Sequence, residues 1–127
     1  LPISVIITGS VYISGSLLVN GNSVALSSSN IAFNTRVITS SYTIQSDDYF
    51  IGVDTNYSGI VVTLPSLTST TNGRVVVIKD IAGLADINQI VVSASSGEQV
   101  DLDTYTTLDI DFVSISAYKD TTGWFIF

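Results

Sequence analysis

Apolar and polar positions alternate in short runs along most of the chain, and this period of two predicts strands rather than helices. β-Branched residues dominate the apolar set, and clusters of Gly, Asn, Asp and Ser separate the runs. No window shows the i, i+3, i+4, i+7 spacing of an amphipathic helix. We therefore predict an all-β protein. The predicted strands span residues 3–7, 10–13, 16–19, 23–26, 35–38, 41–45, 49–53, 59–64, 74–79, 88–94, 98–102, 106–118 and 123–127.

The first thirty residues carry a six-residue repeat in which glycine keeps a fixed place. The pattern is an apolar residue, any residue, Gly, then Ser or Asn, and it begins at Ile7, Ile13 and Val19. Units this short must stack on neighbours to bury their apolar side, which favours a fibre shaft of intertwined identical chains. A second interpretation is two plain hairpins, with Asn20 and Gly21 in a type I′ turn. We assign residues 1–35 to a shaft-like β-repeat segment and joint.

Residues 36–127 form the predicted second domain, a β-sandwich head. Strands recur there with turn residues between them, which is typical of antiparallel sandwiches and jelly rolls. The run at residues 75–78 and the closing Phe125 and Phe127 offer more apolar strand faces than one domain of this size easily keeps dry. A closed three-fold assembly buries such faces, so the head is predicted to be homotrimeric.

The composition mainly excludes some classes of function. Charged residues make up 12% of the chain, and the net charge is −7. Four scattered cations cannot form the basic stripe that nucleic-acid binding requires, and they do not suit an anionic membrane surface. The apolar runs are far shorter than the ~20 residues that cross a bilayer, so we expect no membrane insertion. The surface must be covered by small polar residues or by further copies of the chain.

From Tyr42 onward, short motifs follow one another in a particular order. They occupy residues 42–51, 60–66 (with Thr63-Leu64-Pro65), 73–83 (with Ile78-Lys79-Asp80), 88–92, 112–115 and 123–127. In this order they resemble the C-terminal head module of phage tail fibres and viral fibre proteins, over about two thirds of the chain. The resemblance implies a trimeric β-sandwich head at the tip of a viral appendage, without a transferable catalytic or ligand site.

Together, the repeat and the resemblance predict a structural and attachment protein. It would be the C-terminal tip of a trimeric viral or phage fibre or spike, located on the virion surface. Its partners would be its own copies, the rest of the fibre and a host-surface receptor, with glycans among the candidates. One alternative is a purely structural trimerisation, capping or capsid-decorating domain without a ligand. Another is a secreted carbohydrate-binding module.

Candidate chemistry is sparse. The chain has no His and no Cys, so a nucleophile lacks its usual base, and we expect neither an enzyme nor a cofactor. The candidates for a cation site are two carboxylate pairs, each predicted to share one strand face about 7 Å apart. A glycosidase would also use such pairs. The interpretation we favour is that they line solvated strand faces, with Leu102 and Ile110 pointing inward. These pairs are Asp101 with Asp103 and Asp109 with Asp111.

Loops at one end of a sandwich are the natural place for receptor recognition. The predicted recognition loops span residues 54–59, 67–72, 80–88 and 95–100. The candidate receptor-binding residues are Asn56, Tyr57, Thr70, Asn72, Asp86, Glu98 and Tyr105. Trp124 is expected in the core or in a subunit interface.

Overall fold

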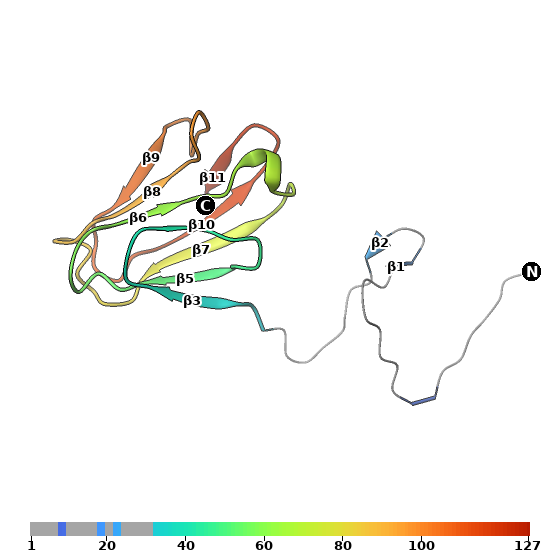
Figure 1. Cartoon of the computed structure of the whole chain (residues 1–127), viewed down its shortest axis with the longest axis horizontal. Coiled ribbons are helices and arrows are strands. Elements are labelled where there is room, and N and C mark those ends of the chain that lie inside the picture. The colour runs from blue at the N-terminus through green and yellow to red at the C-terminus, as the bar shows by residue number, and fades with distance from the viewer. Residues whose placement is uncertain (1–7, 10–17, 20–21, 24–31) are drawn as a thin grey trace, which may run out of the picture. The chain divides into compact units, whose positions relative to one another are not determined.

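The computed structural model describes residues 8–9, 18–19, 22–23 and 32–127. The chain divides into two units, Leu1–Ile31 and Ala32–Phe127 (Figure 1). In the first unit, β1 (Leu18–Val19) pairs antiparallel with β2 (Asn22–Ser23). This register agrees with the hairpin interpretation at that point. The proposed turn at Asn20 and Gly21 and most of the six-residue repeat lie outside the described residues.

The second unit contains two mixed β-sheets and almost no helix, which confirms the all-β prediction. The larger sheet has five strands in the order β11-β10-β7-β5-β3, and the smaller has four in the order β4-β6-β8-β9. No helix in the described part of the chain is long and apolar enough to cross a membrane. The elements are β3 (Thr35–Ile38), β4 (Tyr42–Thr43), β5 (Phe50–Val53), β6 (Ile60–Thr63), the 3₁₀ turn η1 (Leu67–Ser69), β7 (Val75–Asp80), β8 (Ile90–Ser93), β9 (Tyr105–Leu108), β10 (Ser114–Lys119) and β11 (Trp124–Ile126).

From β3 to β8, successive strands alternate between the two sheets (Figure 1). Between two strands of one sheet, the chain runs back through a strand of the other sheet. The strands β3, β5 and β7 therefore point the same way and are parallel neighbours. The strands β4, β6 and β8 are parallel neighbours for the same reason. The prediction of antiparallel, jelly-roll-like connectivity is therefore wrong for these pairs. Apolar alternation reports which face a strand buries and carries no information about its neighbour's direction. Among the named strands of the second unit, which the structure describes throughout, antiparallel pairs come from β9, β10 and β11.

Both sheets contribute to one apolar core. Along β7, the side chains of Val76, Ile78 and Asp80 are buried, whereas those between them are half-buried. Val62 and Ile90 of the smaller sheet belong to the same buried cluster. Trp124 is fully buried, and its indole N–H donates to the carbonyl of Pro65 at 3.0 Å, which confirms its expected place in the core.

The outer side of the larger sheet is also apolar. We call the exposed side chains of Val37, Phe50, Ile81, Tyr118 and Phe127 the outer apolar face. Val37 is 65% exposed and Phe127 70% exposed. A shallow depression of about 310 Å³ lies on this face beside Gly52, where the side chains of Ile81 and Val37 lie close to the glycine. The outer side of the smaller sheet is mixed: it includes Thr43, Thr63, Ser93 and Thr107 together with the exposed Val61 and Tyr105.

Candidate functional site

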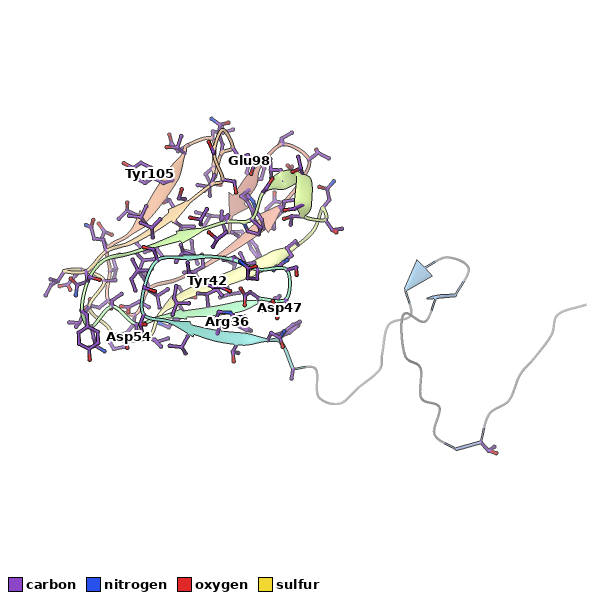
Figure 2. The ribbon with its side chains drawn as sticks, in the orientation of Figure 1. Arg36, Tyr42, Asp47, Asp54, Glu98 and Tyr105 are labelled. Atoms are coloured by element: carbon purple, nitrogen blue, oxygen red, sulfur yellow. The ribbon has the colours of Figure 1, made fainter. Side chains whose placement is uncertain are left out.

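The strands place their connecting loops at two ends of the second unit. The chain enters at Ala32, and β3, β5 and β7 all begin at that end, which we call the proximal end. The loops at residues 39–41, 54–59, 81–89 and 109–113 connect strands at the opposite end, and we call them the distal loops. Figure 2 shows Asp54 at the distal end, away from Asp47 and Glu98 at the proximal end. The distal loops therefore lie furthest from the point where the preceding chain joins.

A buried carboxylate, Asp80, ties three distal loops together. Its side chain is 0% exposed, and it accepts hydrogen bonds from groups in the loops at residues 54–59, 81–89 and 109–113. Burial alone would raise the pKa of Asp80, but these hydrogen bonds outweigh burial and lower the pKa below its ordinary value. The donors are the Thr55 hydroxyl at 2.9 Å and the N–H groups of Ala82 (3.0 Å), Gly83 (3.1 Å), Ala85 (3.3 Å) and Phe112 (3.0 Å).

Large apolar side chains stand exposed on these anchored loops. Tyr57 is 85% exposed, Ile87 74%, Ile110 66% and Phe112 60%. Phe112 has a φ of 58°, and its ring lies directly on Gly83, where an added Cβ would come within 2.3 Å of it. The hydrogen bonds to the buried Asp80 thus fix the backbone of the loops that carry these side chains.

Carboxylates stand beside the apolar side chains of the distal loops. The N–H of Asp86 donates to Oδ1 of Asp111 at 3.2 Å. Desolvation first, and then the hydrogen bond and negative charge of Asp111, raise the pKa of Asp86. Asp54 accepts hydrogen bonds from both the backbone N–H and the side-chain amide of Asn56. The distal end therefore combines exposed apolar groups with negative charge.

The structure separates the predicted receptor-binding residues. Asn56, Tyr57 and Asp86 lie together on the distal loops. Glu98 instead accepts hydrogen bonds from the hydroxyl of Ser66 and the N–H of Leu67, and so braces two proximal loops. The others at the proximal end are Thr70, which is 9% exposed, Asn72, which accepts from Lys119 Nζ at 2.6 Å, and Tyr105, which is 56% exposed.

Sequence reasoning missed Ile87 as well as Phe112, and it placed Ile110 in the interior. Residues 109–113, predicted as part of one strand from 106 to 118, form a turn between β9 and β10. The left-handed conformation of Phe112 that makes this turn has no signal in the sequence, because glycine or asparagine usually occupies such positions.

The two carboxylate pairs do not face one another. Asp101 and Asp103 lie before β9, and Asp109 and Asp111 lie after it, at the other end of the unit. The prediction that they line strand faces is wrong, because both segments are turns, and Leu102 is 74% exposed rather than inward. Its φ of 70° turns the side chain away from the core. Within residues 32–127 and the shorter described pieces, no group of three or more acidic side chains is placed to hold a metal ion.

No protein-family model and no curated protein matches the chain. Its function must therefore be argued from the geometry of the second unit.

Proposed function

We propose that the chain is the tip of a trimeric viral or phage fibre or spike. Its second unit would be a β-sandwich head that binds a host-surface receptor through the distal loops. The observation that carries this proposal is the set of exposed apolar side chains on loops opposite Ala32. Large apolar groups on a surface mark interaction sites, and this position would point them away from the rest of a fibre.

The hydrogen bonds that join three of the distal loops to Asp80 support a recognition role. Binding costs less when the contact surface is already ordered, because little conformational entropy is lost on association. Here the carboxylate of Asp80 fixes the backbone on which Tyr57, Ile87 and Phe112 are presented. Aromatic side chains in such positions frequently dominate the free energy of binding.

The outer apolar face supports the trimeric part of the proposal. A fully exposed aromatic side chain presents roughly 150–250 Å², so the five residues of this face together expose on the order of 500 Å². That is as large as the largest apolar patch of a typical monomer, and the half-buried Val75, Val77 and Phe125 extend it. A stable interface covers about 800 Å² on each partner, so the exposed apolar area of this face would make up over half of one such contact.

A second candidate function, a structural trimerisation or capping domain without a ligand, is favoured by the same face. It requires the outer apolar face to be covered by other copies and assigns no role to the distal side chains. The two candidates therefore share the assembly and differ only at the distal end.

A matched pair of variants separates these candidates. Ile87 and Leu102 are both 74% exposed, but only Ile87 lies on the distal loops. The full chain would be examined by light scattering, by binding to a glycan array and by adsorption to a panel of bacterial and eukaryotic cells. The attachment function predicts a trimer that binds a glycan or a cell type. Ile87→Ser should weaken this binding at least tenfold, and Leu102→Ser should leave it unchanged. A trimer that binds no glycan and no cell favours the structural role. A monomer would contradict both, and a monomer that binds a glycan would favour a secreted carbohydrate-binding module.

A further inference from the structure

Every charged side chain in the distal loops is an aspartate. These loops contain no Lys and no Arg. Among the residues that the structure describes, the ion pair lies elsewhere, between Arg36 and Asp48, so no cation of the chain pairs with the distal carboxylates. They belong to Asp54, which is half-buried, and to the exposed Asp86, Asp109 and Asp111.

One basic residue, Lys79, lies beside the distal loops at the end of β7. Its Nζ donates to the carbonyl of Phe112 and lies 5.4 Å from the centre of the Phe112 ring. An ammonium group at this distance is attracted to the ring. The contact shows that a cation fits beside this exposed aromatic side chain. A single ammonium leaves the distal carboxylates in excess, so the surface stays negative.

The acidic and apolar side chains form one continuous surface. Asp86, Asp109 and Asp111 are each followed directly by an exposed apolar residue. The N–H of Asp86 donates to Oδ1 of Asp111 at 3.2 Å, so their two loops are in contact. The loop at residues 54–59 joins them through the side-chain amide of Asn88, which donates to the carbonyl of Thr55 at 2.6 Å. A partner that covers the apolar groups must therefore also cover the carboxylates.

The contact between Asp86 and Asp111 is electrostatically unfavourable. Desolvation, followed by the hydrogen bond and negative charge of Asp111, raises the pKa of Asp86. Two carboxylates in such contact repel each other, and a cation placed beside both would offset the repulsion. A Lys or Arg side chain of a partner therefore gains more here than beside an isolated carboxylate.

We propose that the distal loops dock on a receptor protein whose contact surface is basic and apolar. Lys or Arg side chains of the receptor pair with Asp86 and Asp111, and its apolar side chains pack on Ile87, Ile110 and Phe112. The same carboxylates repel sialylated or sulfated glycans and anionic lipid headgroups, because like charges across an interface oppose association. The inference rests on the proposed attachment function and names the class of its receptor.

The test uses two random copolymers that share an aromatic residue and differ in charge, poly(Lys,Tyr) and poly(Glu,Tyr). The full chain would be titrated against each by biolayer interferometry. We expect poly(Lys,Tyr) to bind at least about tenfold more tightly than poly(Glu,Tyr). Raising the salt concentration from about 0.05 M to about 0.5 M should weaken this binding about tenfold, because salt screens charges at a surface.

Two matched double variants locate the binding. Asp86→Asn combined with Asp111→Asn keeps the side-chain shapes and should weaken the binding of poly(Lys,Tyr) about tenfold. Asp101→Asn combined with Asp103→Asn removes the same charge from exposed positions at the proximal end, and should weaken it by less than about twofold. On a cell type that adsorbs the chain, protease treatment should abolish adsorption, whereas periodate, which destroys sugars, should leave it unchanged.

Three results would overturn the inference. If poly(Glu,Tyr) binds as tightly as poly(Lys,Tyr), the charge of the partner is not recognised. If both double variants weaken binding equally, the copolymer responds to the net charge of −7 rather than to the distal loops. If periodate abolishes adsorption, the receptor is a glycan. Each of these results leaves the attachment function intact. A chain that adsorbs to no cell and binds no glycan contradicts the attachment function instead, and the copolymers still decide whether the distal loops favour a basic partner.

Discussion

Replacing Asp80 by asparagine should strongly destabilise the second unit. The two side chains have almost the same shape, so no cavity is created. What changes is one carboxylate oxygen, which becomes an amide nitrogen. Oδ1 of Asp80 accepts from Thr55, Ala82 and Gly83, whereas Oδ2 accepts from Ala85 and Phe112.

The geometry sets the size of the effect. Whichever way the amide is turned, two backbone N–H groups face a nitrogen that cannot accept their hydrogen bonds. A buried donor left without an acceptor costs about 1–3 kcal/mol, which gives about 2–6 kcal/mol for two. Removing a buried charge recovers part of this cost, so we expect a loss of about 3 kcal/mol. Because domains are typically stable by only about 5–15 kcal/mol, such a loss is readily measured.

The assay is urea unfolding of wild type and Asp80→Asn at several pH values. The folded state lowers the pKa of Asp80, so its stabilising contribution is present in full above the unfolded-state pKa of about 3.9. This contribution is lost as the pH falls through the lower folded-state pKa. The difference in unfolding free energy between the two proteins should therefore be constant near neutral pH and shrink below about pH 4.

Asp109→Asn is the matched control, because it removes the same charge from an exposed position on the same loops. It should change stability by less than about 0.5 kcal/mol. The reasoning is refuted if Asp80→Asn costs less than about 1 kcal/mol, or if its deficit remains undiminished at acid pH. Amide hydrogen exchange adds a local readout, since Ala85 and Phe112 should lose protection before the core strands do.

Other parts of the structure give further predictions. Gly83→Ala places a methyl group within 2.3 Å of the Phe112 ring at a φ of +74°, and should lower stability by about 1–3 kcal/mol in thermal unfolding. Trp124→Phe removes the hydrogen bond to Pro65 and leaves a cavity, and should cost about 2–4 kcal/mol in urea unfolding, whereas a cost below 1 kcal/mol would contradict its role in the core. Val37→Ser should dissociate the proposed trimer in sedimentation equilibrium without unfolding the monomer; an intact trimer would place the interface elsewhere.

The sequence predicts the strands well where apolar and polar residues alternate. The segment 74–79 corresponds closely to β7, and Trp124 occupies the core as expected. The sequence does not predict how the strands are paired. The same alternation is seen whether the chain returns through the other sheet before the next strand or reverses in a tight turn. The parallel pairing of β5 with β7 depends on where the chain crosses, which is decided by tertiary packing.

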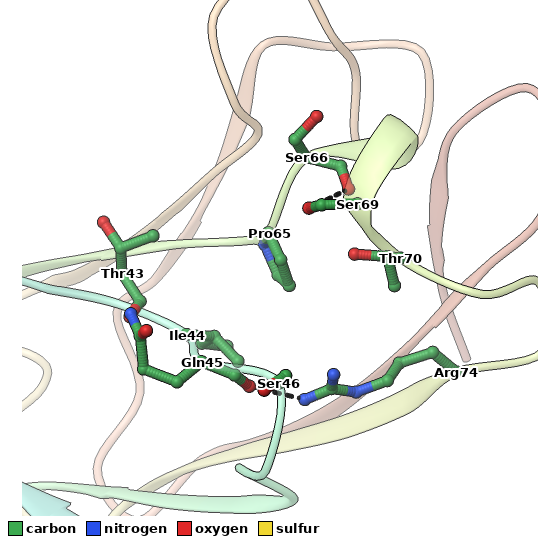
Figure 3. Close-up of a pocket in the computed structure, with 9 residues that line it drawn as sticks. All are labelled: Thr43, Ile44, Gln45, Ser46, Pro65, Ser66, Ser69, Thr70 and Arg74. Atoms are coloured by element: carbon green, nitrogen blue, oxygen red, sulfur yellow. Dashed lines mark hydrogen bonds between the residues drawn. The ribbon is translucent and has the colours of Figure 1, made fainter.

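The candidate site is only partly predictable for a related reason. Asn56, Tyr57 and Asp86 stand in polar loops, and sequence reasoning places them correctly in connections between strands. Asp80 has the sequence pattern of an ordinary turn residue, and only the fold reveals that three loops share its carboxylate. Arg74 and Thr70 come to line one pocket (Figure 3) only because the fold brings the segments 43–46 and 65–70 together, and the sequence does not show this.

The position of β3 determines how the second unit would carry a mechanical load. If the distal loops hold a receptor while the rest of a fibre pulls at Ala32, the force runs along β3 itself. The backbone hydrogen bonds between β3 and β5 extend from the Phe50 N–H and Asn34 carbonyl to the Asp54 N–H and Ile38 carbonyl. Under this force they are sheared together instead of opening one after another. The ion pair between Arg36 and Asp48, at 2.7 Å, and the bond from Asn34 to the carbonyl of Asp47 reinforce the same edge. The strand at which the second unit begins would thus resist extraction under tension.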